Sequence, residues 1–229
     1  MSLLANIFIK LPEWPIKNDI RYFLAFNKLI PNFISNLSPI KGYTLCYNLK
    51  PGDVVVDVGA FTGDYTIFAA RKVGQTGKVI AFEPDKKSRE ILARNISHEK
   101  LDNVIISPKG LWHENTRLRF ESNQGVKSTV FSDNAESYID VASLDDELKK
   151  LGIKKIDVIK MDIEGSEIKA IEGAQQTLKQ KPVLIIASYH IVDGKKTADY
   201  FEKYLPKLGY EVKSVFPTHL TTFAFPVST

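Results

Sequence analysis

Two acidic side chains flank a glycine turn early in the chain. The stretch GDVVVDVGAFTGDY, residues 52–65, starts as an apolar run that carries Asp57 near its end. Gly59 and Gly63 follow, and Asp64 comes directly after the second glycine. Glycines let a backbone approach a ligand closely, whereas two carboxylates repel a polyanion and attract cations or hydroxyl groups. Because the third glycine of a pyrophosphate-binding loop is missing, the turn argues against ATP and NAD and favours a positively charged ligand.

A further acid, Glu83, ends the next apolar stretch, KVIAFE. An acid at the tip of a second strand suits bidentate hydrogen bonds to ribose hydroxyls. The alternative role, an acid that stabilises a helix N-terminus, is better filled by Asp85 as the N-cap. An acidic glycine turn and a ribose-binding acid together predict S-adenosylmethionine, which carries an ammonium group, a sulfonium and a nucleoside but no phosphate.

Three charged residues alternate in a later apolar stretch, VIKMDIE. Lys160, Asp162 and Glu164 would share one side of a strand. A strand buried on both faces should not collect charges without a use for them, so we interpret Asp162 and Glu164 as functional. An ion pair with Asp162 explains Lys160 equally well. Ser166 suits a helix cap and Glu167 suits the first turn of that helix.

Strands that alternate with helices must position these residues. Apolar runs of strand length, separated by helical patterns, occupy residues 53–58, 78–83, 103–107, 155–162 and 182–189. This alternation predicts right-handed βαβ crossovers and a parallel sheet covered on both faces. Ligands bind beyond the carboxyl ends of the strands in such sheets. His190, which directly follows the last run, should reach the same edge, although a lone histidine is more often structural.

The remaining segments depart from this alternation. Short alternating stretches within residues 116–144 predict a hairpin or small antiparallel insertion. The stretches at 210–216 and 221–227 predict an antiparallel hairpin that closes a sheet edge. Residues 1–50 predict an N-terminal helical extension ahead of a domain at 51–229. A cap on the core is favoured for it over a substrate lid or a membrane-surface contact, because apolar stripes usually face a core.

The composition excludes several classes of protein. The net charge of +4 is dispersed over 229 residues without a basic block that contains interleaved aromatics, so no nucleic acid partner is expected. The single cysteine, Cys46, allows no intramolecular disulfide and predicts a cytoplasmic location. No apolar run reaches the roughly 20 residues of a membrane span, and the first residues lack the basic region of a signal peptide.

The acidic stretches resemble one known family. VVVDVGAFTGDYTIFAA followed by GKVIAFEP is similar to the cofactor-binding signature of class I methyltransferases, and DVIKMDIEGSEIKAIEGA resembles the hallmark of the FkbM family. The resemblance covers about residues 43–215. It implies an α/β, Rossmann-like class I fold with a seven-stranded, mostly parallel sheet, helices on both faces and the C-terminal antiparallel hairpin. It also implies methyl transfer from S-adenosyl-L-methionine, commonly to a hydroxyl oxygen.

The predicted cofactor contacts fall on strand ends and turns. After the third strand, Gly110 and Leu111 would flank the adenine, while Trp112 either walls the pocket or packs in the core. The predicted cofactor-binding set is Asp57, Gly59, Ala60, Gly63, Asp64, Glu83, Pro84, Gly110, Leu111 and Asp162.

The predicted catalytic residues are Asp162 or His190 as the base, with Glu164 and Lys160 orienting the acceptor. The family usually carries an acid two residues before this histidine, where this chain has Ser188. A divalent metal held by Asp162, Glu164 and His190 suits these ligand types, but the sequence does not favour it, since the third ligand depends on a loop of unknown course.

We therefore predict O-methylation of a hydroxyl on a small molecule or glycan. The alternative is a nonenzymatic S-adenosylmethionine-binding sensor or partner subunit, which the polar residues at 162, 164 and 190 argue against.

Overall fold

The computed structural model describes residues 39–121, 129–130, 137–215 and 219–227. Its main feature is a seven-stranded sheet with the strand order β12-β13-β9-β8-β1-β2-β3. The parallel strands are β1 (Val54–Val58), β2 (Lys78–Phe82), β3 (Val104–Ser107), β8 (Val158–Met161) and β9 (Val183–Ala187). They follow the five predicted apolar runs, because strands buried on both faces must be apolar almost throughout.

The C-terminal hairpin closes one edge of this sheet. Strand β13 (Thr221–Pro226) pairs antiparallel with β9, and β12 (Tyr210–Val215) pairs antiparallel with β13. The predicted class I fold, with its mostly parallel sheet and antiparallel hairpin, is confirmed.

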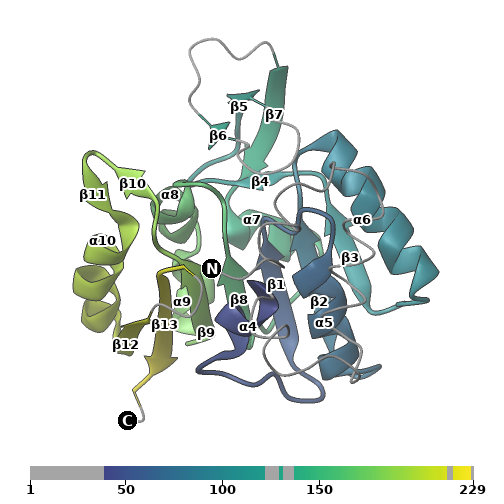
Figure 1. Cartoon of the computed structure of the whole chain (residues 1–229), viewed down its shortest axis with the longest axis horizontal. Coiled ribbons are helices and arrows are strands. Elements are labelled where there is room, and N and C mark those ends of the chain that lie inside the picture. The colour runs from purple at the N-terminus through teal and green to yellow at the C-terminus, as the bar shows by residue number, and fades with distance from the viewer. Residues whose placement is uncertain (1–38, 122–128, 131–136, 216–218, 228–229) are drawn as a thin grey trace, which may run out of the picture.

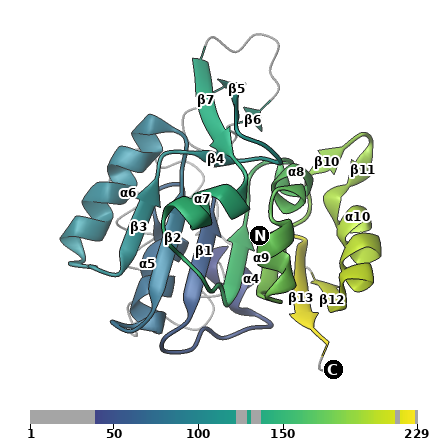
Figure 2. The same ribbon diagram turned by 180° about the vertical axis from the view of Figure 1, so that it is seen from behind.

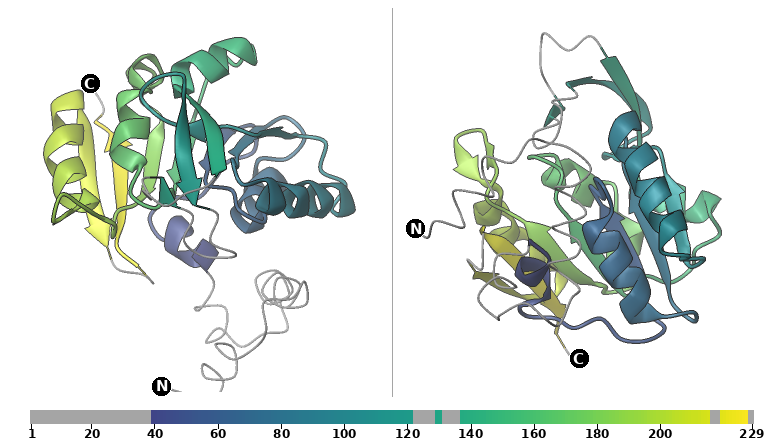
Figure 3. Two further views of the ribbon diagram at one scale, coloured as in Figure 1. Left: turned by 90° about the horizontal axis from the view of Figure 1, so that it is seen from above. Right: turned by 45° about the vertical axis from the view of Figure 1, so that its right-hand side comes forward.

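Helices cover both faces of the sheet. One face carries α4 (Pro39–Thr44), α5 (Asp64–Val73) and α6 (Lys86–His98), of which α4 and α5 lie in front in Figure 1. The other face carries α7 (Leu144–Lys150), α8 (Glu167–Glu172), α9 (Gln175–Lys179) and α10 (Thr197–Tyr204) with the short 3₁₀ helix η1 (Leu205–Leu208), as Figure 2 shows from behind. Figure 3 (left) shows α10, in yellow-green, and α6, in blue, at opposite ends of the sheet.

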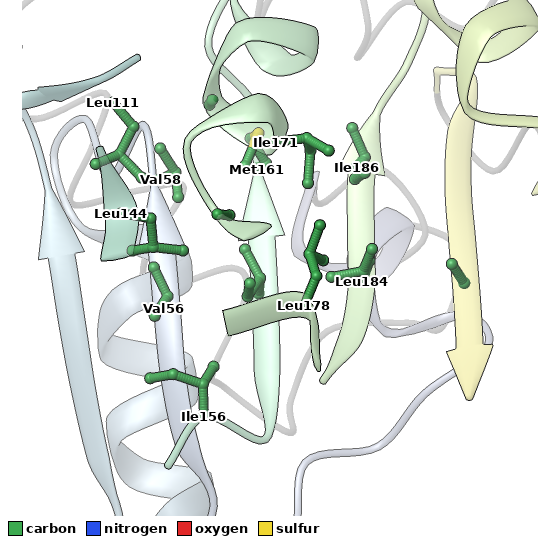
Figure 4. Packing of buried hydrophobic residues seen from close by; sticks show 14 of the residues in the cluster. Val56, Val58, Leu111, Leu144, Ile156, Met161, Ile171, Leu178, Leu184 and Ile186 are labelled. Atoms are coloured by element: carbon green, nitrogen blue, oxygen red, sulfur yellow. The ribbon is translucent and has the colours of Figure 1, made fainter. Parts of the chain in front are cut away.

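The alternation of side chains along each strand divides the core into two layers. Val56 and Val58 of β1 pack toward α7, α8 and α9 with residues such as Ile171 and Leu178 (Figure 4). Val55, between them, packs toward α4 and α5. Strand β1 therefore lies at the centre of the fold, and its carboxyl end is fixed from both sides.

The helix that the sequence predicts after Ser166 is followed by a second one, so residues 166–180 form two helices. Helix α8 ends before Gly173 and α9 begins at Gln175. The carbonyl oxygen of Trp112 lies only 2.1 Å from where a Cβ on Gly173 would be. The break between the helices lets the chain at Trp112 pack against the backbone of Gly173. Helix propensity could not predict this contact, because it depends on a segment far away in the sequence.

The predicted insertion is a four-stranded sheet of order β4-β7-β5-β6, which projects at the top of Figure 1. Its strands are β4 (Gly110–Leu111), β5 (Thr116–Glu121), β6 (Thr129–Val130) and β7 (Ser137–Ala142). Trp112 is buried against Phe120, Ile139 and Val141 of this sheet, so of its two predicted roles it takes the one in the core. Next to α10, β10 (Ile191–Val192) and β11 (Lys195–Lys196) form a small hairpin.

Most of the predicted N-terminal extension, residues 1–38, lies outside the described residues. Its last part is visible as α4, where Tyr43 packs edge-on against Tyr65 of α5 with 5.6 Å between the ring centroids. Cys46 is a free, half-buried thiol that packs against the core layer between the sheet and helices α4 and α5. Within the described part of the chain, no helix is both long enough and apolar enough to span a membrane.

Candidate active site

A cavity of about 400 Å³ opens at the carboxyl ends of β1, β2 and β8. The predicted site residues that line it are Gly59, Ala60, Asp64, Glu83, Pro84, Gly110, Leu111, Lys160, Asp162 and Glu164. Three others, Asp57, Gly63 and His190, lie next to lining residues but do not line the cavity themselves. The edge of the sheet that the sequence predicts is therefore the edge that carries the cavity.

The glycine turn holds a backbone that other residues would strain. Gly59 and Gly63 have φ angles of +77° and +100°, in the left-handed region. A Cβ on Gly59 would lie 2.0 Å from the carbonyl oxygen of Asp162. The amides of Gly59 and Ala60 both donate to the carbonyl of Phe82, at 3.1 Å. The turn is thus fixed to the end of β2 on one side and to the turn after β8 on the other.

Glu83 lies beside this turn, directly after β2. Its carboxylate accepts hydrogen bonds from the amides of Phe61, at 2.7 Å, and Asp85, at 2.9 Å. Burial raises the pKa of Glu83 to about 7, although these two backbone hydrogen bonds act in the opposite direction. A carboxylate has about four acceptor positions, so Glu83 can accept two further hydrogen bonds from hydroxyls in the cavity.

Asp57 points away from the cavity and is paired with Lys160. The two residues are partners in the register of β1 and β8, and their side chains form a buried ion pair of 2.9 Å. Asp57 also accepts from the hydroxyl of Thr66, at 2.6 Å, while Lys160 donates to the carbonyl of Gly59, at 3.0 Å. The alternative pairing of Lys160 with Asp162 is wrong. The charge of Asp57 is therefore compensated inside the protein, and Asp57 does not line the cavity.

The second acidic stretch forms a turn because β8 ends at Met161. Glu164 has a φ of +55° and Gly165 a φ of +100°. Ser166 occupies the N-cap position of α8 but makes no capping hydrogen bond through its side chain. The fully buried Glu167 accepts instead from the amides of Ile163, at 3.0 Å, and Gly165, at 3.3 Å. The carboxylate of Glu167 therefore fixes the backbone of the turn that carries Asp162 and Glu164.

His190 lies against three carboxylates. Its Nδ1 is 2.9 Å from Oε1 of Glu167, and its Nε2 is 3.4 Å from Oε2 of Glu164 and 3.8 Å from Oδ1 of Asp162. Burial favours the neutral ring, but the contacts with Glu164 and Glu167 and the charge of Asp162 outweigh it and raise the pKa of His190 to about 10. With no cation bound, the ring is an imidazolium near neutral pH and cannot accept a proton.

Two tyrosines that the sequence did not mark complete the cavity wall. The hydroxyl of Tyr43, on α4, donates to Oδ2 of Asp162 at 2.7 Å. Tyr189 lies beside His190 with 4.0 Å between the ring centroids. Neither residue belongs to a motif: Tyr43 precedes the first strand, and Tyr189 ends an apolar run that reads as core.

Two solved structures show a similar fold. Methyltransferase FkbM from Methylobacillus flagellatus KT matches with a TM-score of 0.62 at 19% identity, over 80% of this chain and 46% of that chain. Aeropyrum pernix fibrillarin, in complex with natively bound S-adenosyl-L-methionine, matches with a TM-score of 0.57 at 14% identity, over 83% of this chain and 75% of that chain.

Curated relatives are also methyltransferases. Methyltransferase sdnD of Sordaria araneosa is 25% identical over 169 residues, which cover 57% of this chain and 65% of the relative. Hexuronic acid methyltransferase AglP of Haloferax volcanii is 27% identical over 145 residues, 62% of this chain and 59% of the relative. A probable cobalt-precorrin-6B C(15)-methyltransferase of Sulfurisphaera tokodaii is 36% identical over 74 residues, 31% of this chain and 38% of the relative. The chain thus spans 38–65% of the length of these three relatives.

A family model matches most of the described fold. The methyltransferase FkbM domain matches residues 57–212. This range contains the glycine turn, Glu83, the turn at 162–167 and His190. The resemblance seen in the sequence is confirmed, and the chain belongs to the FkbM methyltransferase domain family.

Proposed function

We propose that this protein transfers a methyl group from S-adenosyl-L-methionine to a hydroxyl oxygen of a small molecule or glycan. The observation that carries the proposal is the position of Glu83. Its carboxylate is fixed by two backbone amides at the cavity wall, directly beside a glycine turn without a phosphate-binding pattern. Ribose hydroxyls would complete its hydrogen bonds, and the methionine part of the cofactor would lie along the glycine turn.

The proposed acceptor class follows from one relative and from the side chains at the cavity. AglP is named as a methyltransferase of hexuronic acid, a sugar with several hydroxyls. Asp162, Glu164 and Tyr189 also line the cavity, and their polar groups suit an acceptor with hydroxyl groups. The cytoplasmic location, and the boundary between residues 1–50 and 51–229, stay predictions.

In the proposed reaction, the acceptor oxygen attacks the sulfonium methyl in line. The O–C bond forms, the C–S bond breaks, and S-adenosylhomocysteine leaves while the hydroxyl gives up its proton. The methyl group is already activated, so positioning supplies much of the rate. Asp162 is better placed than His190 to receive the proton, because its Oδ1 makes no hydrogen bond to any described residue whereas His190 is cationic. Lys160 acts as a positioning residue, since it holds Asp57 and the Gly59 carbonyl.

Calorimetric titration of the full chain with S-adenosyl-L-methionine and, separately, with NAD tests the cofactor. We expect binding of the first alone, and no binding of S-adenosyl-L-methionine would overturn the proposal. Incubation with methyl-labelled cofactor and a panel of uronic acids, other sugars and phenols tests the transfer. A protein that binds the cofactor but labels no acceptor would support the sensor or partner-subunit alternative.

Turnover of Asp162→Asn and His190→Ala, with cofactor affinity measured in parallel, tests the acceptor side. A general base typically contributes about 10²–10⁴-fold to a rate, so we expect losses of that size for Asp162→Asn. Normal turnover in both variants would remove this cluster from the mechanism.

A further inference from the structure

We propose that Asp162, Glu164 and His190 form a binding site for a hard divalent cation, Mg²⁺ or Mn²⁺, at the acceptor end of the cavity. The three residues each offer one ligand atom, and these atoms all lie within 4.8 Å of one another. Two carboxylate oxygens and one imidazole nitrogen are a ligand set that such ions accept.

The spacing of the ligand atoms suits a single ion. Two ligands that lie about 2.1 Å from a cation, at right angles to each other, are about 3 Å apart. In the structure, Nε2 of His190 lies 3.4 Å from the oxygen of Glu164 and 3.8 Å from that of Asp162. Shifts of less than about 1 Å would bring both oxygens to bonding distance around one ion.

Unpartnered buried atoms point to a ligand between these residues. His190 is buried, with only 8% of its side chain exposed. Oδ1 of Asp162 and Nε2 of His190 are buried and make no hydrogen bond to any residue that the structure describes, whereas Nδ1 of His190 lies 2.9 Å from Oε1 of Glu167. Buried polar atoms in native proteins almost always have a partner. A cation would provide one for Oδ1 of Asp162 and Nε2 of His190 at once.

Contacts around the ligands already orient them. Tyr43 donates to Oδ2 of Asp162, which leaves Oδ1 for the ion. Oε1 of Glu167 lies 2.9 Å from Nδ1 of His190, so that Nε2 faces Glu164 and Asp162. A carboxylate behind a metal-binding histidine is the usual arrangement that fixes the ring and its tautomer. The same Glu167 holds the turn that presents Glu164.

If the protein has the proposed function, on which this step rests, the cation site would restrict which hydroxyl compounds can serve as acceptors. Asp162 and Glu164 also line the cavity, so an ion between them could take acceptor oxygens as its remaining ligands. Neighbouring oxygens, as in a vicinal diol or an α-hydroxy acid, would bind best. An ion lowers the pKa of a hydroxyl bound to it. With the ion in place, Asp162 serves as its ligand, and the proton of the acceptor hydroxyl passes to bulk water instead of to Asp162.

Titration of the chelator-treated full chain with Mn²⁺, followed by the loss of the free Mn²⁺ signal in electron paramagnetic resonance, tests the site without any turnover. We expect one bound ion per chain, displaced by Mg²⁺. Glu164→Gln should weaken Mn²⁺ binding at least about tenfold, and Glu167→Gln by about 10–100-fold, the range for residues behind a ligand. Glu172→Gln, which removes a carboxylate of α8 that pairs with Lys169, should leave the affinity unchanged.

Absence of bound Mn²⁺, or equal binding by the wild-type chain and Glu164→Gln, would overturn the proposal. Displacement by Zn²⁺ but not by Mg²⁺ would overturn the assignment to a hard cation. Near-UV circular dichroism of each variant verifies that it is folded. Titration of the chelator-treated protein with S-adenosyl-L-methionine is a separate measurement, so a missing metal site and a missing cofactor site can be told apart.

Discussion

Two turns lie side by side at the cavity, and they differ in how their charged residues are compensated. Residues 59–63, after β1, use left-handed glycines, and the nearby acids are satisfied inside the protein: Asp57 by Lys160, Glu83 by two amides. Residues 162–165, after β8, also use left-handed backbone, but Oδ1 of Asp162 and Nε2 of the neighbouring His190 make no hydrogen bond to a described residue. The acids near the first turn thus have their partners within the protein, whereas the second turn presents buried polar atoms that lack one among the described residues.

Loss of the buried lysine tests the claim that the first turn is internally compensated. Breaking a buried pair by removing one partner costs about 3–5 kcal/mol, so Lys160→Met should lower the free energy of unfolding by that amount in a denaturant titration. The double variant Asp57→Asn/Lys160→Met should recover part of it. Lys155→Met, which removes an exposed lysine paired with Asp157, should destabilise the protein far less, because exposed ion pairs contribute little. Equal effects of Lys160→Met and Lys155→Met would contradict the comparison.

Gly59→Ala tests the contact between the turns. A left-handed alanine costs about 1–2 kcal/mol, and the clash with the Asp162 carbonyl adds about 1–3 kcal/mol of overpacking. Gly152→Ala is the matched control, because Gly152 also has a positive φ, +69°, and nothing lies within 4 Å of its added Cβ. The difference between the two free energies of unfolding reports the contact alone, and a difference near zero would show that the turns move independently.

The pH dependence of cofactor binding tests Glu83. Its pKa in the folded protein is raised to about 7, so the carboxylate that ribose hydroxyls would bind is lost as the pH falls through 7. The dissociation constant for S-adenosyl-L-methionine should then rise by up to about tenfold per pH unit. Glu83→Gln should bind about tenfold more weakly at pH 8, a loss of about 1.4 kcal/mol, with no step near pH 7. If the dissociation constant of Glu83→Gln also changes near pH 7, a group other than Glu83 causes the pH dependence.

The smallest effect is expected at the cap of α8. Ser166 makes no capping hydrogen bond, since Glu167 holds this turn. Ser166→Ala should therefore change the free energy of unfolding by less than about 0.5 kcal/mol. Ser143→Ala should cost about 1 kcal/mol, because Ser143 caps α7 by accepting from the amide of Asp146. Thermal unfolding of the two variants measures both effects, and a larger destabilisation by Ser166→Ala than by Ser143→Ala would contradict the prediction.

The sequence predicted the sheet and the edge that carries the cavity, because buried parallel strands leave unbroken apolar runs and their ends carry the polar residues. Glu83 was found from its place at the end of such a run. The partner of Lys160 was not, since it depends on which strand lies beside β8 and in which register. Glu167 read as an ordinary acid of a first helical turn, because its contact with His190 joins segments that only the fold brings together.

The close approach of Gly59 to the Asp162 carbonyl has a consequence for how relatives of this protein could diverge. Because the two backbones leave no room for a Cβ between them, an insertion or altered path in the turn at 162–165 would displace the turn at 59–63 as well. Differences in what the cavity binds would then arise through exchanges of side chains such as Glu164 and Tyr189, or through the β4-β7-β5-β6 sheet, and not through the backbone of either turn.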